Sequence, residues 1–587
     1  MNKSGQLLVL LLVLILALVG CSAPAPAAPT EKPGAAPAAA EATATTAPEP
    51  TKAPAKLKAI TAMKFANDPK SIDPQRAVDT RDWELLAQLF PSLTETDPQT
   101  NELVPGVAKS WEVSSDGLVY TFHLMEKVPW VRYNADTKAV EEAKDKDGKV
   151  LFVTAKDFAY GFVRALDPKT GSPAAYMLAP YIVGAADFNA GKGSADKVGV
   201  KAVDDYTFQI TTPEKVGFAL AIYSIINARA TPEWAIQASG DAWTDPKNIN
   251  TYGPFALQDW VHESSMTYVK NPFWPGSKGI QQAKLDMITF RFVDETVGLR
   301  EYEAGNIDVT DLPGDQIPRL RADATLSKQL NILPNGCSGA FGLNSSKPPF
   351  TNVHIRRAFN YAVDRESLVK DVLAGGQIPA RFFTPSNVPM APSAAKENDA
   401  LGIKYDPDKA KQELALGLKD LGLTSADQLP GITMEFGTGR EASSVSQALQ
   451  AMWQKTLGVK VELKQIDNTV YWSQQEKDGG QIHRAGWCPD YNDPNNYLRD
   501  VYRSDSIYNY GKYNDPEFDK LIDQARVETD PATRLKLYTQ AEQLLNVDDA
   551  GNLSLFYAVR AQLTKPNVIR TYSLGPIQHF WDWDITQ

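Results

Sequence analysis

Residues that commonly bind metals are scarce in this chain of 587 residues, which has five His and three Cys. The five His stand far apart in the sequence, at His123, His262, His354, His483 and His579. No His-Glu-x-x-His helix can form from such spacing, so the two-histidine zinc site of that motif is excluded. We therefore expect no metal site and no cofactor.

The chain also lacks a surplus of basic residues. Lys and Arg number 60 against 71 Asp and Glu, which gives a net charge of −11. A protein that binds nucleic acid needs cations to neutralise the phosphate backbone. We therefore expect no nucleic-acid partner.

Common catalytic and phosphate-binding motifs are missing as well. The sequence contains no Gly-x-Ser-x-Gly elbow, no Walker loop and no Gly-x-Gly-x-x-Gly fingerprint. A partial EF-hand pattern at 145–148 places Ala143 and Thr154 where carboxylate ligands are required, so it fails. These absences favour a binding protein over an enzyme. A pair of carboxylates suited to glycoside hydrolysis stays open.

No hydrophobic run is long enough to span a membrane. The longest, residues 7–19, has 13 residues, whereas a spanning helix needs about 20. After one Lys at position 3, this run is typical of a signal peptide covering residues 1–20. It ends in the sequence LVGC, which resembles the bacterial lipobox and implies a lipid on Cys21. The alternative is an ordinary secretory signal followed by an incidental Cys.

Residues 22–56 are dominated by Ala, Pro and Thr and are nearly free of large apolar side chains. Such a segment cannot bury a core, so we interpret 21–56 as a lipidated Cys followed by an extended tether. This places the folded body outside the cytoplasmic membrane, in the periplasm or at the cell surface. That compartment permits disulfides, and Cys337 and Cys488 are the two remaining cysteines. Two buried free thiols are the alternative.

From residue 57 onward, short β-like runs alternate with helical ones, which predicts a mixed α/β body. Residues 120–124 and 459–464 alternate apolar and polar positions, as half-buried strands do. Two helices are predicted, at 446–457 before Gly458 and at 407–416 after Asp406. The charged stretch 134–149 is expected at the surface, and its role cannot be predicted.

Several motifs in order resemble one protein family. The most specific are GLNSSKPPF at 342–350 and NVHIRRAFNYAVDR at 352–365. Others are SIDP at 71–74, AKSW at 108–111, TAKDF at 154–158, YGPF at 252–255, NPFW at 271–274, AGNID at 304–308 and YDPDKA at 405–410. Together they resemble the family 5 extracellular solute-binding proteins of bacterial ABC importers, from residue 57 to the C-terminus.

Within that family, the sequence RAGWCPDYNDP at 484–494 is most similar to the oligopeptide-binding proteins. The resemblance implies that Asp490 pairs with the α-ammonium of a bound peptide and that Cys337 and Cys488 form a disulfide. The chain departs from the pattern of that family at two places. Pro489 replaces a small residue and so removes a backbone amide near the site, and the sequence WVRY at 130–133 replaces the usual WSDG.

A buried peptide needs a partner for each terminal charge, because an unpaired buried ion costs several kcal/mol. Asp490 can accept from the ammonium, and Arg484 can chelate a carboxylate through two parallel hydrogen bonds. Only six positions separate these residues, which is too few to bracket a long extended peptide. Arg484 resembles the residue with which the oligopeptide-binding proteins hold the carboxylate of short ligands. Trp487 is expected to form a wall against the first peptide unit. Gly486 and Tyr491, in the same stretch, complete the candidate ligand-binding residues.

The resemblance implies a two-lobed fold of the periplasmic-binding-protein type II, with an extra inserted domain and a hinge. The first lobe would comprise 57–94, 205–336 and 561–587, the inserted domain 95–204 and the second lobe 337–560. Closure of the lobes would trap the ligand, as hinge motions do in binding proteins.

These observations predict a lipid-anchored, monomeric receptor that delivers oligopeptides to an ABC transporter permease in the membrane. Within the family, an oligosaccharide, nickel or a metallophore is the alternative ligand. The alternative from another class is a secreted glycoside hydrolase.

Overall fold

The computed structural model describes residues 57–78 and 80–586. The predicted signal peptide, Cys21 and the tether lie outside these residues. Among the described residues, no helix combines the length and the apolar character required to cross a membrane.

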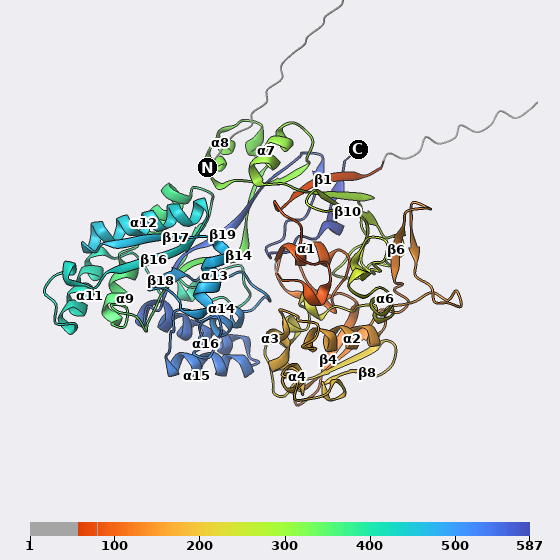
Figure 1. Ribbon diagram of the computed structural model, residues 1–587, viewed down its shortest axis with the longest axis horizontal. Helices are drawn as coiled ribbons and strands as arrows, with labels where there is room; N and C mark the ends of the chain where they lie inside the picture. Colours follow the sequence, from red (N-terminus) through yellow and green to blue (C-terminus); the bar gives the residue numbers. More distant parts are fainter. Residues whose placement is uncertain (1–56, 79, 587) are drawn as a thin grey trace, which may run out of the picture. The chain divides into compact units, whose positions relative to one another are not determined.

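One large mixed sheet runs through the body (Figure 1). It has eleven strands. In spatial order they are β10 (Phe255–Val261), β11 (Ser265–Lys270), β12 (Met287–Phe292), β1 (Ala59–Lys64), β13 (Val309–Asp311), β19 (Asn552–Thr564), β14 (Leu330–Leu343), β18 (Ile482–Arg484), β16 (Ile432–Gly437) and β17 (Val461–Ile466), with β15 (Ile378–Pro379) beside β19. Strand β1 is parallel to β12 and β13, and β16 is parallel to β17 and β18.

The long strands β14 and β19 connect the two halves of this sheet. They pair in antiparallel fashion from Leu330 with Leu563 to Gly342 with Asn552. The register shifts between Pro334 and Ser338, so the ladder is interrupted near its middle. An interruption there, in the two strands that connect the halves, is where a hinge can bend.

Hydrophobic side chains form separate cores on the two sides of this interruption. The first core gathers residues from 60–309 and 568–583, and the second gathers residues from 341–556. We call the parts around them the first and second lobes. Of the residues described, Tyr491 is the one residue of the second lobe that belongs to the first core.

A smaller sheet belongs to the first lobe. Its strands are β4 (Ala108–Val113), β5 (Val119–Leu124), β9 (Thr207–Thr211) and β8 (Val200–Ala202). Two-stranded pairs are formed by β2 (Thr94–Thr96) with β3 (Leu103–Pro105), β6 (Val131–Asn134) with β7 (Ala139–Glu142), and β20 (Val568–Ile569) with β21 (Asp584–Ile585). Strand β9 belongs to the same sheet as β4, β5 and β8, although it lies beyond residue 204, where the predicted inserted domain ends. The division into domains stays a prediction.

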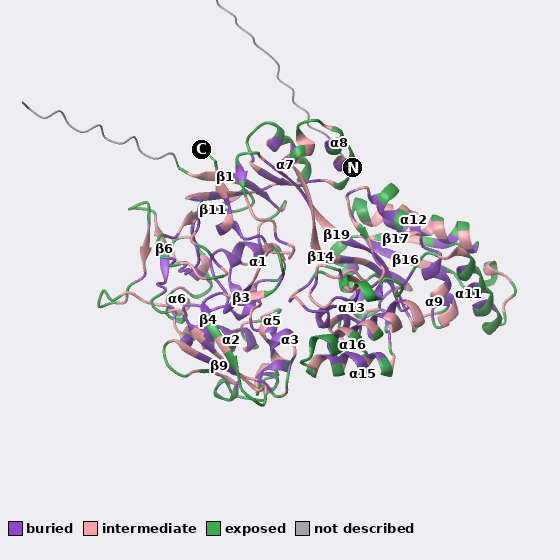
Figure 2. Ribbon diagram, turned by 180° about the vertical axis from the view of Figure 1, so that it is seen from behind, coloured by how far each residue is buried: buried purple, intermediate pink, exposed green. Residues whose placement is uncertain are grey.

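The helices cover these sheets. Those of the first lobe are α1 (Thr80–Ala87), α2 (Ala155–Leu166), α3 (Ala175–Leu178), α4 (Ala185–Asn189), α5 (Ala219–Ile222), α6 (Glu233–Ser239), α7 (Glu295–Glu303) and α8 (Ile317–Ala322). Those of the second are α9 (Val353–Tyr361), α10 (Arg365–Ser367), α11 (Pro407–Asp420), α12 (Arg440–Leu457), α13 (Asn468–Lys477), α14 (Asn495–Tyr502), α15 (Pro516–Val527) and α16 (Pro531–Gln543). Figure 2 shows exposed residues gathered on helices such as α11 and α15.

The α/β prediction and the predicted elements are confirmed, with differences at the ends of the helices. Strand β5 begins one residue before the first alternating segment and ends with it. Strand β17 overlaps the second segment but is shifted by two residues toward the C-terminus. Helix α11 opens at Pro407, where the Asp406 side chain accepts from the amide of Lys409, and continues four residues further than predicted. Helix α12 ends before Gly458, as predicted, but begins at Arg440 rather than at residue 446. The residues of its first turn are exposed or half-buried, so no apolar periodicity in the sequence indicated that the helix begins there.

The charged stretch 134–149 contains the turn and the second strand of the β6–β7 hairpin. Most of its side chains are exposed, whereas Ala143 is buried. The prediction of a surface excursion is confirmed.

Candidate functional site

The stretch 485–488 extends strand β18 along the edge of β14. The amide of Ala485 donates to the Ala340 carbonyl at 2.9 Å, and Trp487 exchanges two backbone hydrogen bonds with Ser338, at 2.8 and 3.1 Å. Cys488 and Cys337 are joined by a disulfide at the end of this ladder, with 4.1 Å between their Cα atoms. The stretch is therefore fixed to the second lobe along one edge.

Its other edge is open. The backbone groups of Gly486 and Cys488 make no hydrogen bond within the part of the chain that the structure describes. At Gly486, a Cβ atom would lie 2.5 Å from the carbonyl oxygen of Ser338, so only glycine permits this close pairing. Alternate residues of a strand direct their backbone groups to opposite edges, so Gly486 and Cys488 present an unpaired strand edge.

Three cavities adjoin this stretch and divide the candidate residues among them. Arg484, Gly486 and Trp487 line a cavity of about 130 Å³. Cys488 lines both that cavity and a cleft of about 1180 Å³, and the latter also touches residues of both lobes. Asp490 and Tyr491 line a third cavity of about 110 Å³. Arg484 and Asp490 therefore do not share a cavity.

Asp490 is a half-buried carboxylate with neutral partners. Its Oδ2 accepts from the Tyr176 hydroxyl at 2.7 Å and from the Asn496 amide at 3.2 Å. No ion pair to Asp490 occurs among the described residues. Burial raises the pKa of Asp490 to about 6, and the charge of Asp500 adds to this, while the two hydrogen bonds act in the opposite direction.

Asn496, in the first turn of α14, holds this part of the loop. Its Oδ1 accepts from the Asp490 amide at 2.8 Å and from the Trp487 indole at 2.9 Å. Its Nδ2 donates to both Asp490 and Asp500, at 3.2 and 3.1 Å. One amide side chain therefore fixes Trp487 and Asp490 relative to each other.

A cluster of three aromatic rings begins at Tyr176, which contacts the Asp490 carboxylate. The Tyr508 ring contacts those of Tyr176 and Trp487, with centroids 5.7 and 5.0 Å apart. Tyr176 comes from α3 of the first lobe, so the hydrogen bond from Tyr176 to Asp490 joins the two lobes. Ring faces attract cations, so carboxylate and rings together suit an ammonium group.

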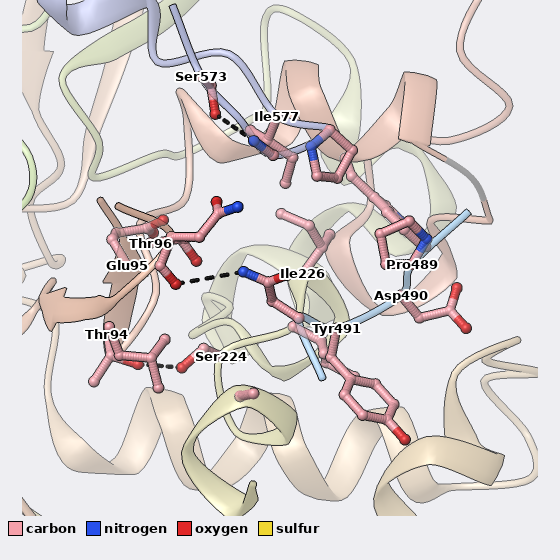
Figure 3. Close-up of a pocket in the computed structure, with 18 of the residues that line it drawn as sticks. Thr94, Glu95, Thr96, Ser224, Ile226, Pro489, Asp490, Tyr491, Ser573 and Ile577 are labelled. Atoms are coloured by element: carbon pink, nitrogen blue, oxygen red, sulfur yellow. Dashed lines mark hydrogen bonds between the residues drawn. The ribbon is translucent and has the colours of Figure 1, made fainter. Parts of the chain in front are cut away.

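Tyr491 has a packing role in this structure. Its ring stacks on Phe218 of the first lobe at 5.6 Å, and its hydroxyl donates to Asp500 at 2.6 Å. Figure 3 shows the Asp490 carboxyl and the Tyr491 phenol extending away from the side of the cavity formed by Thr94, Glu95 and Thr96.

Arg484 is exposed at the end of β18, where its amide donates to the Tyr471 hydroxyl at 2.7 Å. Its guanidinium makes no ion pair within 4.0 Å among the residues described. Glu441 lines the same cavity, and burial raises the pKa of Glu441 while the charge of Arg484 lowers it. Arg484 is therefore accessible to an anionic group, with Glu441 as a competitor.

Tyr176, Asn496 and Tyr508 were not predicted. Asn496 could have been found, since it follows Asp490 by six residues at the start of a helix. Tyr176 belongs to no motif and lies 314 residues from Asp490 in the sequence. Within the described residues, no three His, Cys, Asp or Glu side chains are grouped to hold a metal ion.

Comparison with known proteins identifies the family. The sequence profile of the "Bacterial extracellular solute-binding proteins, family 5 Middle" matches residues 102–509. The chain belongs to this family. Oligopeptide-binding protein OppA of Bacillus subtilis is 32% identical over 507 residues, which cover 84% of this chain and 86% of the relative. The periplasmic oligopeptide-binding protein OppA of Salmonella typhimurium is 31% identical over 502 residues, 85% and 87% of the two chains.

A solved structure of a family relative agrees with the fold. Haemophilus influenzae OppA in complex with the peptide RPPGFSPFR is 26% identical and superposes with a TM-score of 0.70, over 91% of this chain and 99% of that one. The predicted family and the periplasmic-binding-protein-like α/β fold are confirmed. The Salmonella typhimurium relative is named a periplasmic protein. A solved structure from Bacillus anthracis, 26% identical with a TM-score of 0.71 over 91% of this chain and 99% of that one, is described as the substrate-binding domain of an oligopeptide ABC transporter.

Proposed function

We propose that this chain captures oligopeptides between its lobes and delivers them to an ABC transporter permease. The observation that carries the proposal is Asp490, a half-buried carboxylate beside the lobe interface that has no cationic partner among the described residues. A buried carboxylate in this state is stabilised by an external cation. The α-ammonium of a peptide supplies such a cation.

The open edge of the 485–488 stretch supports binding of the peptide main chain. An extended peptide that lies along Gly486 and Cys488 adds a strand to the sheet and satisfies their unpaired backbone groups. Main-chain hydrogen bonds are independent of the side chains, so they give affinity for many sequences. The large cleft beside Cys488 leaves space for the peptide side chains.

Two further roles complete the proposed site. Trp487, held by Asn496, forms a wall beside the peptide ammonium. Arg484 pairs with the terminal carboxylate of a short peptide that runs from Asp490 past Cys488 and Gly486. Because Arg484 is exposed and close to Glu441, its contribution is smaller than that of Asp490.

Anchoring completes the proposal. The lipobox-like sequence before Cys21 supports a lipidated N-terminus, a tether through residue 56 and a monomeric body held near the permease. The variant Cys21→Ala should appear in the soluble fraction with unchanged peptide affinity. Persistence of the variant on membranes after a salt wash would contradict the anchor.

Identification of the natural ligand tests the function. The protein is purified without refolding and denatured, and the released compounds are analysed by mass spectrometry. We expect short peptides with free amino termini. Oligosaccharides or a metal chelate would replace the proposed ligand class, and turnover of oligosaccharides by the purified protein would establish the hydrolase alternative.

A further inference from the structure

A second contact between the lobes does not involve the connecting strands β14 and β19. It is made by residues 214–218 of the first lobe, which join β9 to α5. The amide of Gly217 donates to the carbonyl of Arg526 at 3.0 Å, and its carbonyl accepts from Nη1 of Arg534 at 3.3 Å. Glu214 forms an ion pair with Arg526. Arg526 belongs to α15 and Arg534 to α16 of the second lobe (Figure 1).

Gly217 permits this close approach because it has no side chain. A Cβ atom at position 217 would overlap the carbonyl oxygen of Glu528 and lie 3.0 Å from Nε of Arg534. The three atoms nearest to such a Cβ all belong to the second lobe. The φ of Gly217 is not positive, so its backbone conformation is open to alanine. An alanine at 217 would therefore be strained only while the two lobes touch.

The same contact continues into the loop that carries Asp490. Arg534 pairs with Asp493 of this loop at 2.6 Å, and its guanidinium lies over the Phe218 ring, 5.6 Å from the centroid. Phe218 stacks on Tyr491 of the loop. Arg534 and Phe218 therefore hold the first lobe directly against the loop of the proposed ammonium site.

The contact is separate from the space available to a ligand. Neither Gly217 nor Arg534 is among the residues that line the three cavities described above. A ligand enclosed by two lobes binds to their closed arrangement, so its apparent affinity is reduced by the fraction of molecules that are not closed. Loss of a contact made only on closure lowers this fraction by the same factor for every enclosed ligand.

We propose that residues 214–218, here called the lobe latch, hold the first lobe against α15, α16 and the Asp490 loop and thereby set the affinity for all enclosed peptides. Gly217 and Arg534 are the positioning residues of this latch. The inference rests on the proposed function, since the latch acts on a peptide held between the lobes. Because the latch must separate before the peptide can leave, its effect falls mainly on the dissociation rate.

The variant Gly217→Ala tests the latch with a tripeptide and with its N-acetylated analogue. Calorimetry and stopped-flow dissociation should show both peptides weakened by the same factor, about tenfold or more, mainly through faster release. The matched control is Gly431→Ala in the second lobe, where a Cβ would meet nothing within 4 Å and φ is not positive. This control should leave both dissociation constants unchanged.

A charge exchange across the lobes tests the same contact independently. Glu214→Lys brings two cations together when the lobes close, and should weaken both peptides several-fold. Addition of Arg526→Glu to that variant should restore most of the affinity. Such a rescue requires the two side chains to meet in the peptide-bound protein, and damage within one lobe does not produce it.

The outcomes separate the two proposals. If the wild type binds the tripeptide but Gly217→Ala changes its dissociation constant less than twofold, or weakens the two peptides by different factors, the latch is wrong and the peptide-binding function stands. An equal loss in Gly431→Ala, or a charge exchange that restores nothing, would also overturn the latch. If the wild type binds no peptide, the proposed function fails and the latch fails with it.

Discussion

Asp490 and Asp493 lie three residues apart on one loop, yet their surroundings differ completely. Asp493 accepts from the Arg534 guanidinium at 2.6 Å and from the Tyr538 hydroxyl at 2.8 Å. Within the described part of the chain, the Asp490 carboxyl accepts from a neutral hydroxyl and a neutral amide and from no cation. Among the residues that the structure describes, Asp493 therefore has a cationic partner and Asp490 has none. This difference separates a structural ion pair from a binding group.

Removing each negative charge in turn should have opposite consequences for the stability of the folded protein. Asp493→Asn leaves the buried Arg534 without its partner and should lower the free energy of unfolding by about 3–5 kcal/mol. Asp490→Asn should cause no such loss at pH 7.5, because an ionised Asp490 is itself unfavourable in the folded protein. Urea unfolding monitored by tryptophan fluorescence measures both variants.

The pH dependence of the free energy of unfolding provides a second test of the result for Asp490. The pKa of Asp490 is raised in the folded state to about 6, so the folded protein holds this proton more tightly than the unfolded chain. The contribution of this group to stability is therefore fully present below pH 4 and is lost as the pH rises through 6. Equal destabilisation by both substitutions at pH 7.5 would remove the distinction between the two residues.

The disulfide that precedes this loop is expected to have the next largest effect. It closes a loop between cysteines 151 positions apart, and its removal should lower the free energy of unfolding by about 2–5 kcal/mol. The double variant Cys337→Ser/Cys488→Ser, compared with the wild type in urea, measures this. Two free thiols in the unfolded, unreduced wild type would show that the disulfide is absent in solution.

Peptide affinity should depend on pH through the same carboxyl group. Binding of an ammonium requires Asp490 to be ionised, so the dissociation constant should increase about tenfold per unit as the pH falls below 6. The weak binding that remains in Asp490→Asn should lose this acid dependence. Calorimetry from pH 4.5 to 7.5 tests both, and an unchanged slope in the variant would assign the titration to another group.

The smallest effect is expected at the other end of the proposed peptide site. Arg484 is exposed, and exposed charge pairs contribute up to about 1 kcal/mol. Arg484→Ala should therefore weaken a tripeptide about fivefold or less, and should not affect a peptide with an amidated C-terminus. A loss as large as that of Asp490→Asn would mean that lobe closure buries Arg484 more deeply.

The sequence alone predicted the parts of this account that depend on local pattern. The motifs around residues 342–365 and 484–494 identified the family and singled out Asp490. Alternating residues located strands β5 and β17. The Asp406 and Gly458 caps fixed one end each of α11 and α12. The other ends have no side-chain cap, and the interpretation missed that α11 continues through the buried Leu418.

The contacts that make Asp490 unusual could not be predicted in this way. Tyr176 reaches Asp490 only because α3 of the first lobe packs beside the second lobe. The separation of Arg484 from Asp490 depends on the Ser338–Trp487 pairing and on the disulfide, which place the two ends of the stretch at different cavities. Such arrangements follow from tertiary packing, which a single sequence does not display.

One calorimetric measurement tests directly whether Asp490 binds the α-ammonium of a peptide. The wild type and Asp490→Asn are each titrated at pH 7.5 with a tripeptide and with its N-acetylated analogue. Removing one partner of a buried charge pair costs about 2–5 kcal/mol. We therefore predict that the substitution weakens the free-amine peptide roughly 30- to several-thousand-fold and leaves the weaker binding of the acetylated peptide nearly unchanged. Equal losses for both peptides, or no loss for either, would contradict the account.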